Sequence, residues 1–476
     1  MKSSNPNTVI FRYKWDALIL IFLMPLLAIN LNGYHDVGDD FAQYLLQARW
    51  LTGDQLAWFP SHAGSYSPGI KGWLFSVMLI PATFGTFPAD IIMSKLIVSA
   101  FLILAGWVFF RILHSFFPAL TAFGCTLFLV YNPMMLDLKN QILPDIPMMA
   151  TFLLTFYLLF FQKSTTISIV ISALLIWLSA GLKTPALLLI IPVVGWFVTT
   201  TFAGRYKFLI VSLTGMLVVP AFEFVLASAN NGLVWYWQQT IALISPSSMQ
   251  LNATTYFQSL QLIPQLELPM WINNVILAML SFGWLLGVVF SFFPETGSRH
   301  HLKSKYFERS ILLFQLGYVF LLLFYPYQGD PVRMLLPIFP FLLITTFKGF
   351  SSFLERVNFS WYKTVAVLAG LLLPVLMIPS LLKLPSKIQD ARKEYKANLN
   401  LAQFLKSATE PSEVLKSNKP WAIQYYADRI TLPESDLHQV KRIVLSAAVQ
   451  NPDSMTHSNH KIIYQNDFWL VYEVEP

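Results

Sequence analysis

Residues 15–51 decide the fold class, and they read WDALILIFLMPLLAINL, then NGYHDVG, then DDFAQYLLQARWL. The first part, Trp15 to Leu31, is an apolar run long enough to cross the hydrocarbon core of a bilayer. It follows several basic residues and no small-residue cleavage site comes after it. We therefore interpret it as a retained membrane anchor rather than a signal peptide, with the N-terminus in the cytoplasm.

The composition of the whole chain is typical of a membrane protein. Of the 476 residues, 55% are hydrophobic and only 12% are charged, about half the ~25% charged share of a soluble domain. Cys125 is the only cysteine, which excludes a disulfide framework. The net charge of +7 comes from basic residues in short loops between apolar runs, as the positive-inside rule predicts, and this argues against nucleic-acid binding.

Ten further apolar runs bring the predicted number of membrane spans to about eleven. The basic loops near 205–207, 299–309 and 348–363 fall on the cytoplasmic side only if the short run 69–84 does not cross. We therefore expect 69–84 to be a juxtamembrane or re-entrant helix on the outer side. The ten runs lie near 91–112, 118–133, 146–162, 166–181, 183–202, 207–228, 271–293, 310–325, 333–350 and 363–382.

Charged and polar residues become common after about residue 390. The predicted fold class is an all-α polytopic membrane bundle, residues 1–389, with a small soluble α/β domain, residues 390–476. An odd number of spans places this domain outside the cytoplasm. Within it, 398–406 has helical spacing, and the segments 422–426, 442–445, 462–464 and 468–472 are expected to be short strands, the last two as a hairpin.

The segment after the anchor predicts a short amphipathic helix on the outer surface that begins with two acids, Asp39 and Asp40. Its apolar residues recur at helical spacing. Two interpretations remain open. Acids at a helix start, with Gln43 three residues after Asp40, are typical of helix capping. Adjacent residues do not share a helix face, however, so one acid could cap while the other acts as a general base in glycosyl transfer.

Five basic residues are predicted to lie on the same outer side. A lipid-phosphate leaving group departs as a stable anion, so a transferase would need such cations more than a general acid. The alternative for each is snorkelling to the interface or an ordinary ion pair, such as Arg333 with Asp330. The five candidates are Arg49, Lys71, Lys139, Lys183 and Arg333.

Asp145 lies between Pro144 and Pro147, where one span ends and the next begins. It could orient an acceptor, help to hold a cation or cap the following helix. Glu223, near the outer end of its span, is a weaker candidate for a buried acid. The histidines show no metal-ligand spacing, so we predict no metal site from the motifs, although a requirement for a divalent cation stays open.

Taken in order, these segments resemble the GT-C class of integral-membrane glycosyltransferases, in the branch of the protein O-mannosyltransferases and the bacterial aminoarabinose transferase for lipid A. Asp40 stands where the family has Glu, and the lysine that some relatives carry before a Pro-Pro pair has no counterpart. The segments that carry the resemblance are Asp39 to Tyr44, Tyr66 to Gly69 with Trp73 to Phe75, Asn132-Pro133 with Asp145, Gly181 to Pro185, and Arg333 to Pro337 with Phe339-Pro340.

The resemblance implies an inverting transfer of a sugar from a polyprenyl-phosphate donor to a lipid, glycan or protein acceptor. It implies a multi-pass protein of the plasma membrane, such as a bacterial inner membrane, with its active site on the outer face. Asp39 is then the expected base, with Asp40 beside it. Donor phosphate binding is expected from Lys71, Lys183, Arg333 and Arg49, and Asp145 is the acid of the second outer loop. The alternative function is a multi-pass transporter or lipid flippase, which would also contain spans broken by Pro.

Overall fold

A computed structural model describes most of the chain. The described residues are 6–35, 39–53, 73–162, 165–200, 204–228, 246–260, 268–292, 299–324, 331–357, 361–433, 440–446 and 460–474.

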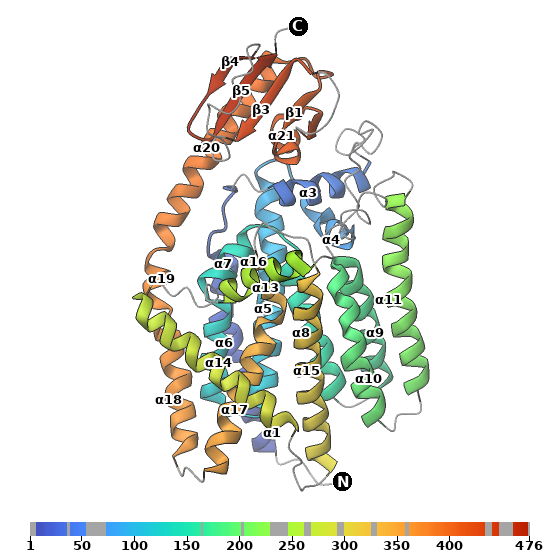
Figure 1. Ribbon diagram of the computed structural model, residues 1–476, viewed down its shortest axis with the longest axis vertical. Coiled ribbons are helices and arrows are strands. Elements are labelled where there is room, and N and C mark those ends of the chain that lie inside the picture. The colour runs from blue at the N-terminus through green and yellow to red at the C-terminus, as the bar shows by residue number, and fades with distance from the viewer. Residues whose placement is uncertain are drawn as a thin grey trace.

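The helices form a long bundle with a small sheet at one end (Figure 1). Each apolar run predicted to cross the membrane overlaps one main helix of the bundle, and some runs also contain a short helix. These helices are α1 (Pro6–Leu23), α5 (Ala89–His114), α6 (Ala119–Val130), α8 (Asp145–Phe160), α9 (Thr166–Leu182), α10 (Ile190–Thr199), α11 (Arg205–Ser228), α14 (Met270–Phe292), α15 (Arg299–Leu323), α17 (Phe339–Arg356) and α18 (Tyr362–Val375).

By length and apolarity alone, five helices in the described part of the chain can cross a membrane, or six if the bent pair α6 and α7 (Pro133–Asn140) is one span. The molecule is a multi-pass membrane protein. The total of eleven spans stays a prediction.

Short helices lie mainly toward the end of the bundle that carries the sheet. There, α3 (Asp39–Leu51) lies beside α4 (Trp73–Thr83) (Figure 1). With 11 residues, α4 is about 16 Å long and too short to cross a hydrocarbon core of about 30 Å, in line with the expectation for 69–84. The other short helices are α2 (Pro25–Ala28), η1 (Thr184–Leu189), α13 (Pro246–Leu260), α16 (Pro331–Leu335), η2 (Leu336–Ile338) and α19 (Ile378–Leu382).

The two ends of the bundle differ in charge. The last turns of α5, α10, α14 and α17 and the first turns of α6, α11, α15 and α18 lie together at the end opposite the sheet (Figure 1). Several of the helices carry Lys and Arg toward this end, as the charge pattern of the sequence predicts for one side of a membrane. The described basic residues include Lys14, Arg111, Arg205, Lys207, Lys305, Arg309, Lys348 and Arg356.

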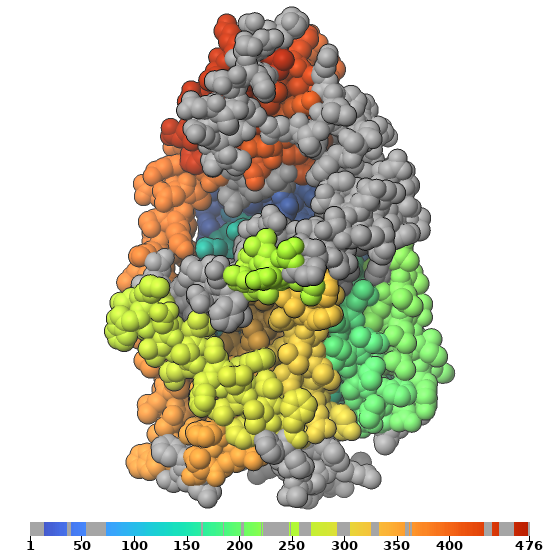
Figure 2. All heavy atoms as spheres, in the orientation of Figure 1, coloured from blue at the N-terminus to red at the C-terminus, as the bar shows by residue number. Residues whose placement is uncertain are grey.

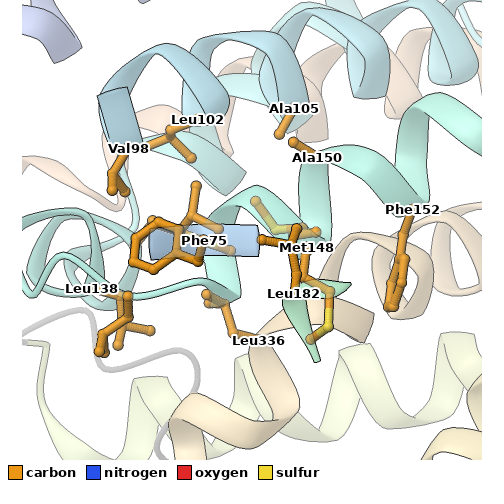
Figure 3. Close-up of a cluster of buried hydrophobic side chains, with 14 of the residues drawn as sticks. Phe75, Val98, Leu102, Ala105, Leu138, Met148, Ala150, Phe152, Leu182 and Leu336 are labelled. Carbon is orange, nitrogen blue, oxygen red and sulfur yellow. The ribbon is translucent and has the colours of Figure 1, made fainter. Parts of the chain in front are cut away.

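A cluster of buried apolar side chains fixes α4 against the bundle (Figure 3). Phe75 of α4 is fully buried, and so are Val98 and Leu102 of α5. Leu138 of α7 and Leu336 of η2 are also buried in this cluster. Close packing of these side chains holds α4 in place although it does not cross.

Glycines allow α6 and α18 to approach until their backbones touch. A Cβ built on Gly124 of α6 would lie 1.6 Å from the carbonyl oxygen of Gly370 in α18, and one on Gly370 would lie 2.6 Å from the Cα of Thr121. Membrane helices have little hydrophobic driving force between them, so close contact at small residues supplies much of their association.

The C-terminal region forms a five-stranded sheet with the order β2-β1-β3-β5-β4. Its strands are β1 (Leu415–Ser417), β2 (Thr431–Pro433), β3 (Arg442–Ser446), β4 (His460–Gln465) and β5 (Trp469–Val474). β1 pairs in parallel with β2 and β3, whereas β5 is antiparallel to β3 and β4. The expected hairpin is therefore β4–β5, and the expected strand at 442–445 is β3.

One expected strand is wrong, because 422–426 lies in a helix, α21 (Pro420–Ala427). Pro420 stands at the first helical position, where its missing N–H costs nothing. All five residues of the segment are buried, Gln424 included, so the segment has no periodicity that separates a helix from a strand. The helix α20 (Leu384–Ala408) joins the bundle to the sheet, and the predicted boundary at 389/390 falls inside it.

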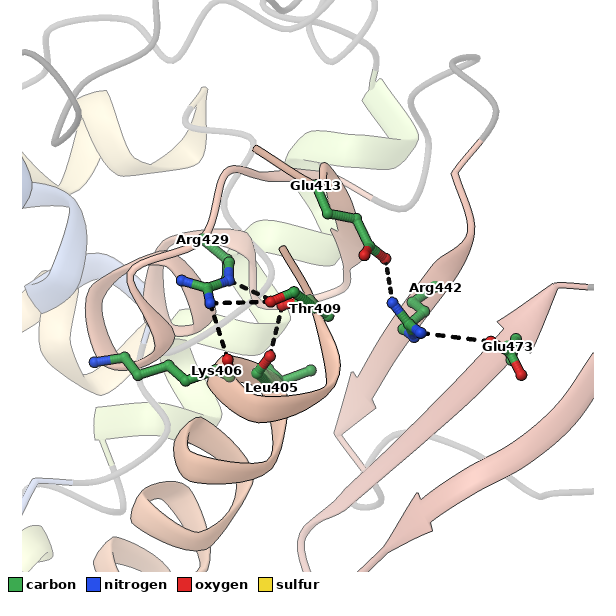
Figure 4. Close-up of polar contacts among 7 residues, drawn as sticks. All are labelled: Leu405, Lys406, Thr409, Glu413, Arg429, Arg442 and Glu473. Atoms are coloured by element: carbon green, nitrogen blue, oxygen red, sulfur yellow. Dashed lines mark hydrogen bonds and ion pairs between the residues drawn. The ribbon is translucent and has the colours of Figure 1, made fainter. Parts of the chain in front are cut away.

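Polar contacts fasten α20 to the strands that follow it (Figure 4). Arg429, beside β2, donates to the Thr409 hydroxyl and to the carbonyl oxygen of Lys406 at the end of α20. Arg442 of β3 pairs with Glu413 at 2.5 Å and with Glu473 of β5 at 3.5 Å. The helix and the sheet are thus one connected unit.

We expect Gly124→Ala to lower the melting temperature of the protein in detergent, because the added Cβ forces α6 and α18 apart. Overpacking of this kind costs about 1–3 kcal/mol. Gly317→Ala is the matched control, since a Cβ there meets only the ends of flexible side chains, the nearest being the Cδ2 atom of Leu188 at 3.1 Å and the Cδ1 atom of Ile191 at 3.4 Å. Equal melting temperatures for the two variants would contradict the close α6–α18 contact.

Candidate active site

A buried carboxylate at the start of α8 holds two cations. Asp145 has 1% of its side chain exposed. Its Oδ1 atom accepts from Lys183 Nζ at 2.5 Å, and its Oδ2 atom accepts from Arg333 Nε at 2.9 Å. The side chains of Lys183 and Arg333 are 17% and 8% exposed. Burial of any one of these charges alone would be costly, so the three stabilise one another.

Arg333 extends the cluster to the acidic start of α3. Its Nη1 atom donates to Asp40 Oδ2 at 2.6 Å, and the Asp40 side chain is 51% exposed. We call Asp40, Asp145, Lys183 and Arg333 the ion-pair cluster. It joins segments separated by 188 and 293 residues in the sequence and contains two negative and two positive groups.

Local structure places each member of the cluster at the end of a helix. Asp145 is in the first turn of α8, where the helix dipole favours negative charge. Lys183 adopts an extended conformation between α9 and η1, because Pro185 follows closely and the α-helix ends there. Arg333 lies on α16, which precedes the Pro337 break into η2 and α17.

Two further residues lie on the Asp40 face of α3, and the sequence interpretation missed both. Tyr44 interacts electrostatically with Arg333. Gln47 accepts a hydrogen bond from Ser76 of α4 at 2.7 Å, and its buried Nε2 atom has no hydrogen-bond partner among the described residues. Their spacing of four and seven residues from Asp40 is the helical signal that could have identified them.

Arg49 does not join the ion-pair cluster. It lies nine residues after Asp40 on α3, which is about 13 Å along the axis and about 180° around it. Its Nη2 atom instead pairs with Asp90 of α5 at 2.8 Å. Lys139, another cation candidate, is buried in α7 and donates to the carbonyl oxygen of Ile29 at 2.7 Å.

The segment that leads into α3 is held by two buried lysines. Besides the bond from Lys139 to Ile29, Lys95 of α5 donates to the carbonyl oxygen of Tyr34 at 2.5 Å and to Asn32 Oδ1 at 3.2 Å. These bonds tie the chain between α2 and α3 to the bundle. They therefore help to fix where the acidic end of α3 lies.

Some predicted residues lie outside the described part of the structure. Lys71 is one of them, and so is Asp330, the suggested partner of Arg333. Asp39 is the first residue of α3 and Glu223 lies in α11, but the side chains of both are outside the described set. The described residues contain no group of three or more His, Cys, Asp or Glu that could hold a metal ion.

We expect Asp145→Asn to destabilise the protein by about 3–5 kcal/mol, because it leaves two buried cations without their shared anion. The readout is the melting temperature in detergent. Asp137→Asn is the control with the same chemical change: Asp137 is 48% exposed and lies 3.5 Å from Lys387, so its loss should cost less than about 1 kcal/mol. Equal shifts for both variants would argue against the central role of Asp145.

Comparison with solved structures identifies the fold. ArnT from Cupriavidus metallidurans in the apo state matches with a TM-score of 0.56 and 13% identity, covering 97% of this chain and 98% of that one. The same ArnT bound to undecaprenyl phosphate matches with 0.56 and 13%, covering 96% and 98%. The oligosaccharyltransferase AglB from Archaeoglobus fulgidus, in complex with an inhibitory peptide and a dolichol-phosphate, matches with 0.51 and 12%, covering 92% and 70%.

No protein-family model matches the chain, and neither does any curated protein sequence. At these identities the likeness concerns the fold alone. ArnT and AglB are both GT-C glycosyltransferases, so the expected architecture is confirmed: the chain has the GT-C fold, a helical membrane bundle with a small C-terminal sheet.

Proposed function

We propose that this chain is an inverting glycosyltransferase that moves a sugar from a polyprenyl-phosphate donor to an acceptor on the extracytoplasmic face of the membrane. The observation that carries the proposal is the ion-pair cluster, in which acids and cations from distant segments meet beside α3. The GT-C fold supports the reaction class. The undecaprenyl phosphate bound by one ArnT structure and the dolichol-phosphate bound by AglB support the donor class.

The charge at the two ends of the bundle supports the side of the membrane. The helix ends that carry Lys and Arg lie at one end, which the positive-inside rule assigns to the cytoplasm. The cluster lies near α3, toward the opposite end, together with the C-terminal sheet. The donor then keeps its isoprenoid chain in the bilayer and presents its phosphate at the outer leaflet, in a plasma membrane such as a bacterial inner membrane.

Lys183 and Arg333 are the proposed ligands of the donor phosphate. Both are cations with limited exposure, and charge-assisted hydrogen bonds from such groups to phosphate oxygens are strong. They would stabilise the negative charge that develops as the bond between the sugar and the phosphate breaks. Lys71, which precedes α4 in the sequence, is proposed as a further ligand on the strength of the sequence resemblance.

Asp39 is the proposed general base. The sequence resemblance assigns it this role, and Asp40 beside it is already engaged by the Arg333 guanidinium. In the proposed step the acceptor oxygen or nitrogen attacks the anomeric carbon, its proton passes to Asp39, and the polyprenyl phosphate leaves with the bonding electrons. Attack from the face opposite the phosphate inverts the anomeric configuration.

We propose that the acceptor approaches through a hollow in the surface beside α20. Figure 2 shows the surface hollowed between α20 and α13, with blue and teal atoms of the first third of the chain visible at its floor. Asp40 is the half-exposed member of the cluster. We propose that the acceptor is a hydroxyl or amine of a lipid, glycan or protein that enters from this side.

We expect Asp39→Asn to lower the rate of transfer about 100-fold or more, because a positioned general base contributes about 10²–10⁴-fold. Transfer is measured as release of polyprenyl phosphate from a polyprenyl-phosphate sugar, with membrane extract as the source of acceptor. Asp390→Asn, an exposed acid on α20, should retain the full rate. If Asp39→Asn retains near-normal activity, the assigned base is wrong.

We expect Lys183→Gln to weaken binding of polyprenyl phosphate by about tenfold or more, since a hydrogen bond to a charged group contributes about 1.5–3 kcal/mol. Binding is followed by native mass spectrometry, which also identifies any lipid that copurifies with the wild type. Lys387→Gln, on α20, removes an exposed lysine as the control. A wild-type protein that binds no polyprenyl phosphate would favour a transporter of a soluble solute.

A further inference from the structure

The helix α3 has two faces with different neighbours. Asp40, Tyr44 and Gln47 lie along one face, which meets Arg333 and the α4 residues Phe75 and Ser76. Phe41 and Arg49 lie on a different side of the helix from this face, and both contact α21 of the C-terminal domain. The helix is thus packed between the membrane bundle and the C-terminal domain.

A polar contact joins three separate parts of the molecule at Asp90. This carboxylate is fully buried in the first turn of α5. Its Oδ2 atom accepts from Arg49 Nη2 at 2.8 Å and from the Tyr425 hydroxyl at 2.7 Å. The Asp90 side chain therefore connects the bundle, α3 and the C-terminal domain through one oxygen atom.

Tyr425 contacts α3 through its ring as well as its hydroxyl. The Arg49 guanidinium carbon lies 4.9 Å from the centre of the Tyr425 ring, in cation–π geometry. The Phe41 ring meets the same ring edge-on, with the centres 5.5 Å apart. Burial and the nearby negative charge of Asp90 raise the pKa of Tyr425 well above its ordinary value, so the hydroxyl keeps its proton and acts as the donor.

The domain that holds Tyr425 is itself firmly built. Tyr425 and Tyr426 of α21 are buried and pack against Phe87, which precedes α5. Trp469 of β5 donates to Asn398 of α20 at 2.7 Å. A displacement of the domain would therefore pass through α21 to α3 rather than be absorbed inside the domain.

We propose that the C-terminal domain positions the acidic helix α3 for catalysis, and that Tyr425 and Arg49 are the positioning residues. The inference rests on the proposed function, since it concerns the same site. Tyr425 and Arg49 hold the face of α3 opposite Asp40, and the helix start carries the proposed base. Loosening this contact shifts the acids relative to the cations, which are fixed on other elements by Asp145.

The test combines steady-state kinetics with amide hydrogen exchange of residues 39–51. Tyr425→Phe removes the bond to Asp90 and keeps the ring, and Tyr425→Leu removes both. We expect kcat to fall about threefold for the first and at least tenfold for the second. KM for the donor should stay within twofold, because Lys183 and Arg333 are untouched. Exchange in α3 should rise in the same order, while exchange in α8 stays unchanged.

Tyr464→Phe and Tyr464→Leu are the matched controls. Tyr464 lies on β4, the edge strand of the sheet, where it also makes one hydroxyl contact, to Asn466, and one ring contact, to Phe404. These variants should leave kcat and α3 exchange within twofold of the wild type. If Tyr425→Leu does not yield folded protein, Arg49→Lys probes the same junction, and it should also lower kcat and raise exchange in α3.

Two outcomes overturn the inference. One is that the Tyr425 variants keep the wild-type kcat and the wild-type exchange of α3. The other is that the Tyr464 variants change both quantities equally, which would indicate a general role of domain stability. Failure of the proposed function can be distinguished from failure of this inference. In that case the wild type has no transfer activity, but the exchange measurement still reports whether Tyr425 holds α3.

Discussion

The placement of the candidate site depends on one buried carboxylate. Asp145 is almost fully inaccessible to solvent and has two cations as partners. A buried charge without partners is strongly unfavourable, so the segments that supply these cations must meet α8 at this point. This requirement brings the α9–η1 junction and α16 together. Arg333 then reaches Asp40, and through it the buried pair in the bundle sets the position of a helix that does not cross the membrane.

The helix α3, with 13 residues, is held by polar contacts on two opposite faces. On one face Asp40 meets Arg333, and on the other Arg49 meets Asp90. Both contacts involve a buried partner from the bundle, so neither is a solvated surface pair of little value. The segment before α3 is also held by a polar contact to the bundle, because Lys95 donates to the carbonyl oxygen of Tyr34. A site that must align a base with a sugar benefits from such fixed geometry.

The sequence predicts the membrane bundle and the chemistry of the site better than their geometry. Apolar runs indicate helices because each span must satisfy its own backbone. Acids and cations on the outer side indicate a polar site, because charges at membrane depth are costly unless they are paired or functional. The pairing itself was not predictable, because Arg333 had a neighbouring candidate in Asp330 and its described partners are 188 and 293 residues away. For α21, complete burial removes the periodicity that would have distinguished a helix from a strand.

Under the proposed function, the two acids of the cluster respond differently to the donor, because one is exposed and the other is buried. Asp145 is inaccessible, so its bonds to Lys183 and Arg333 persist when a ligand arrives. Asp40 is half exposed and holds Arg333 from the solvent-accessible side of the cluster. A donor phosphate that approaches the same guanidinium therefore competes with Asp40 and not with Asp145. The carboxylate it displaces is that of Asp40 at the start of α3, so under the proposed function binding of the donor breaks the bond between α3 and Arg333.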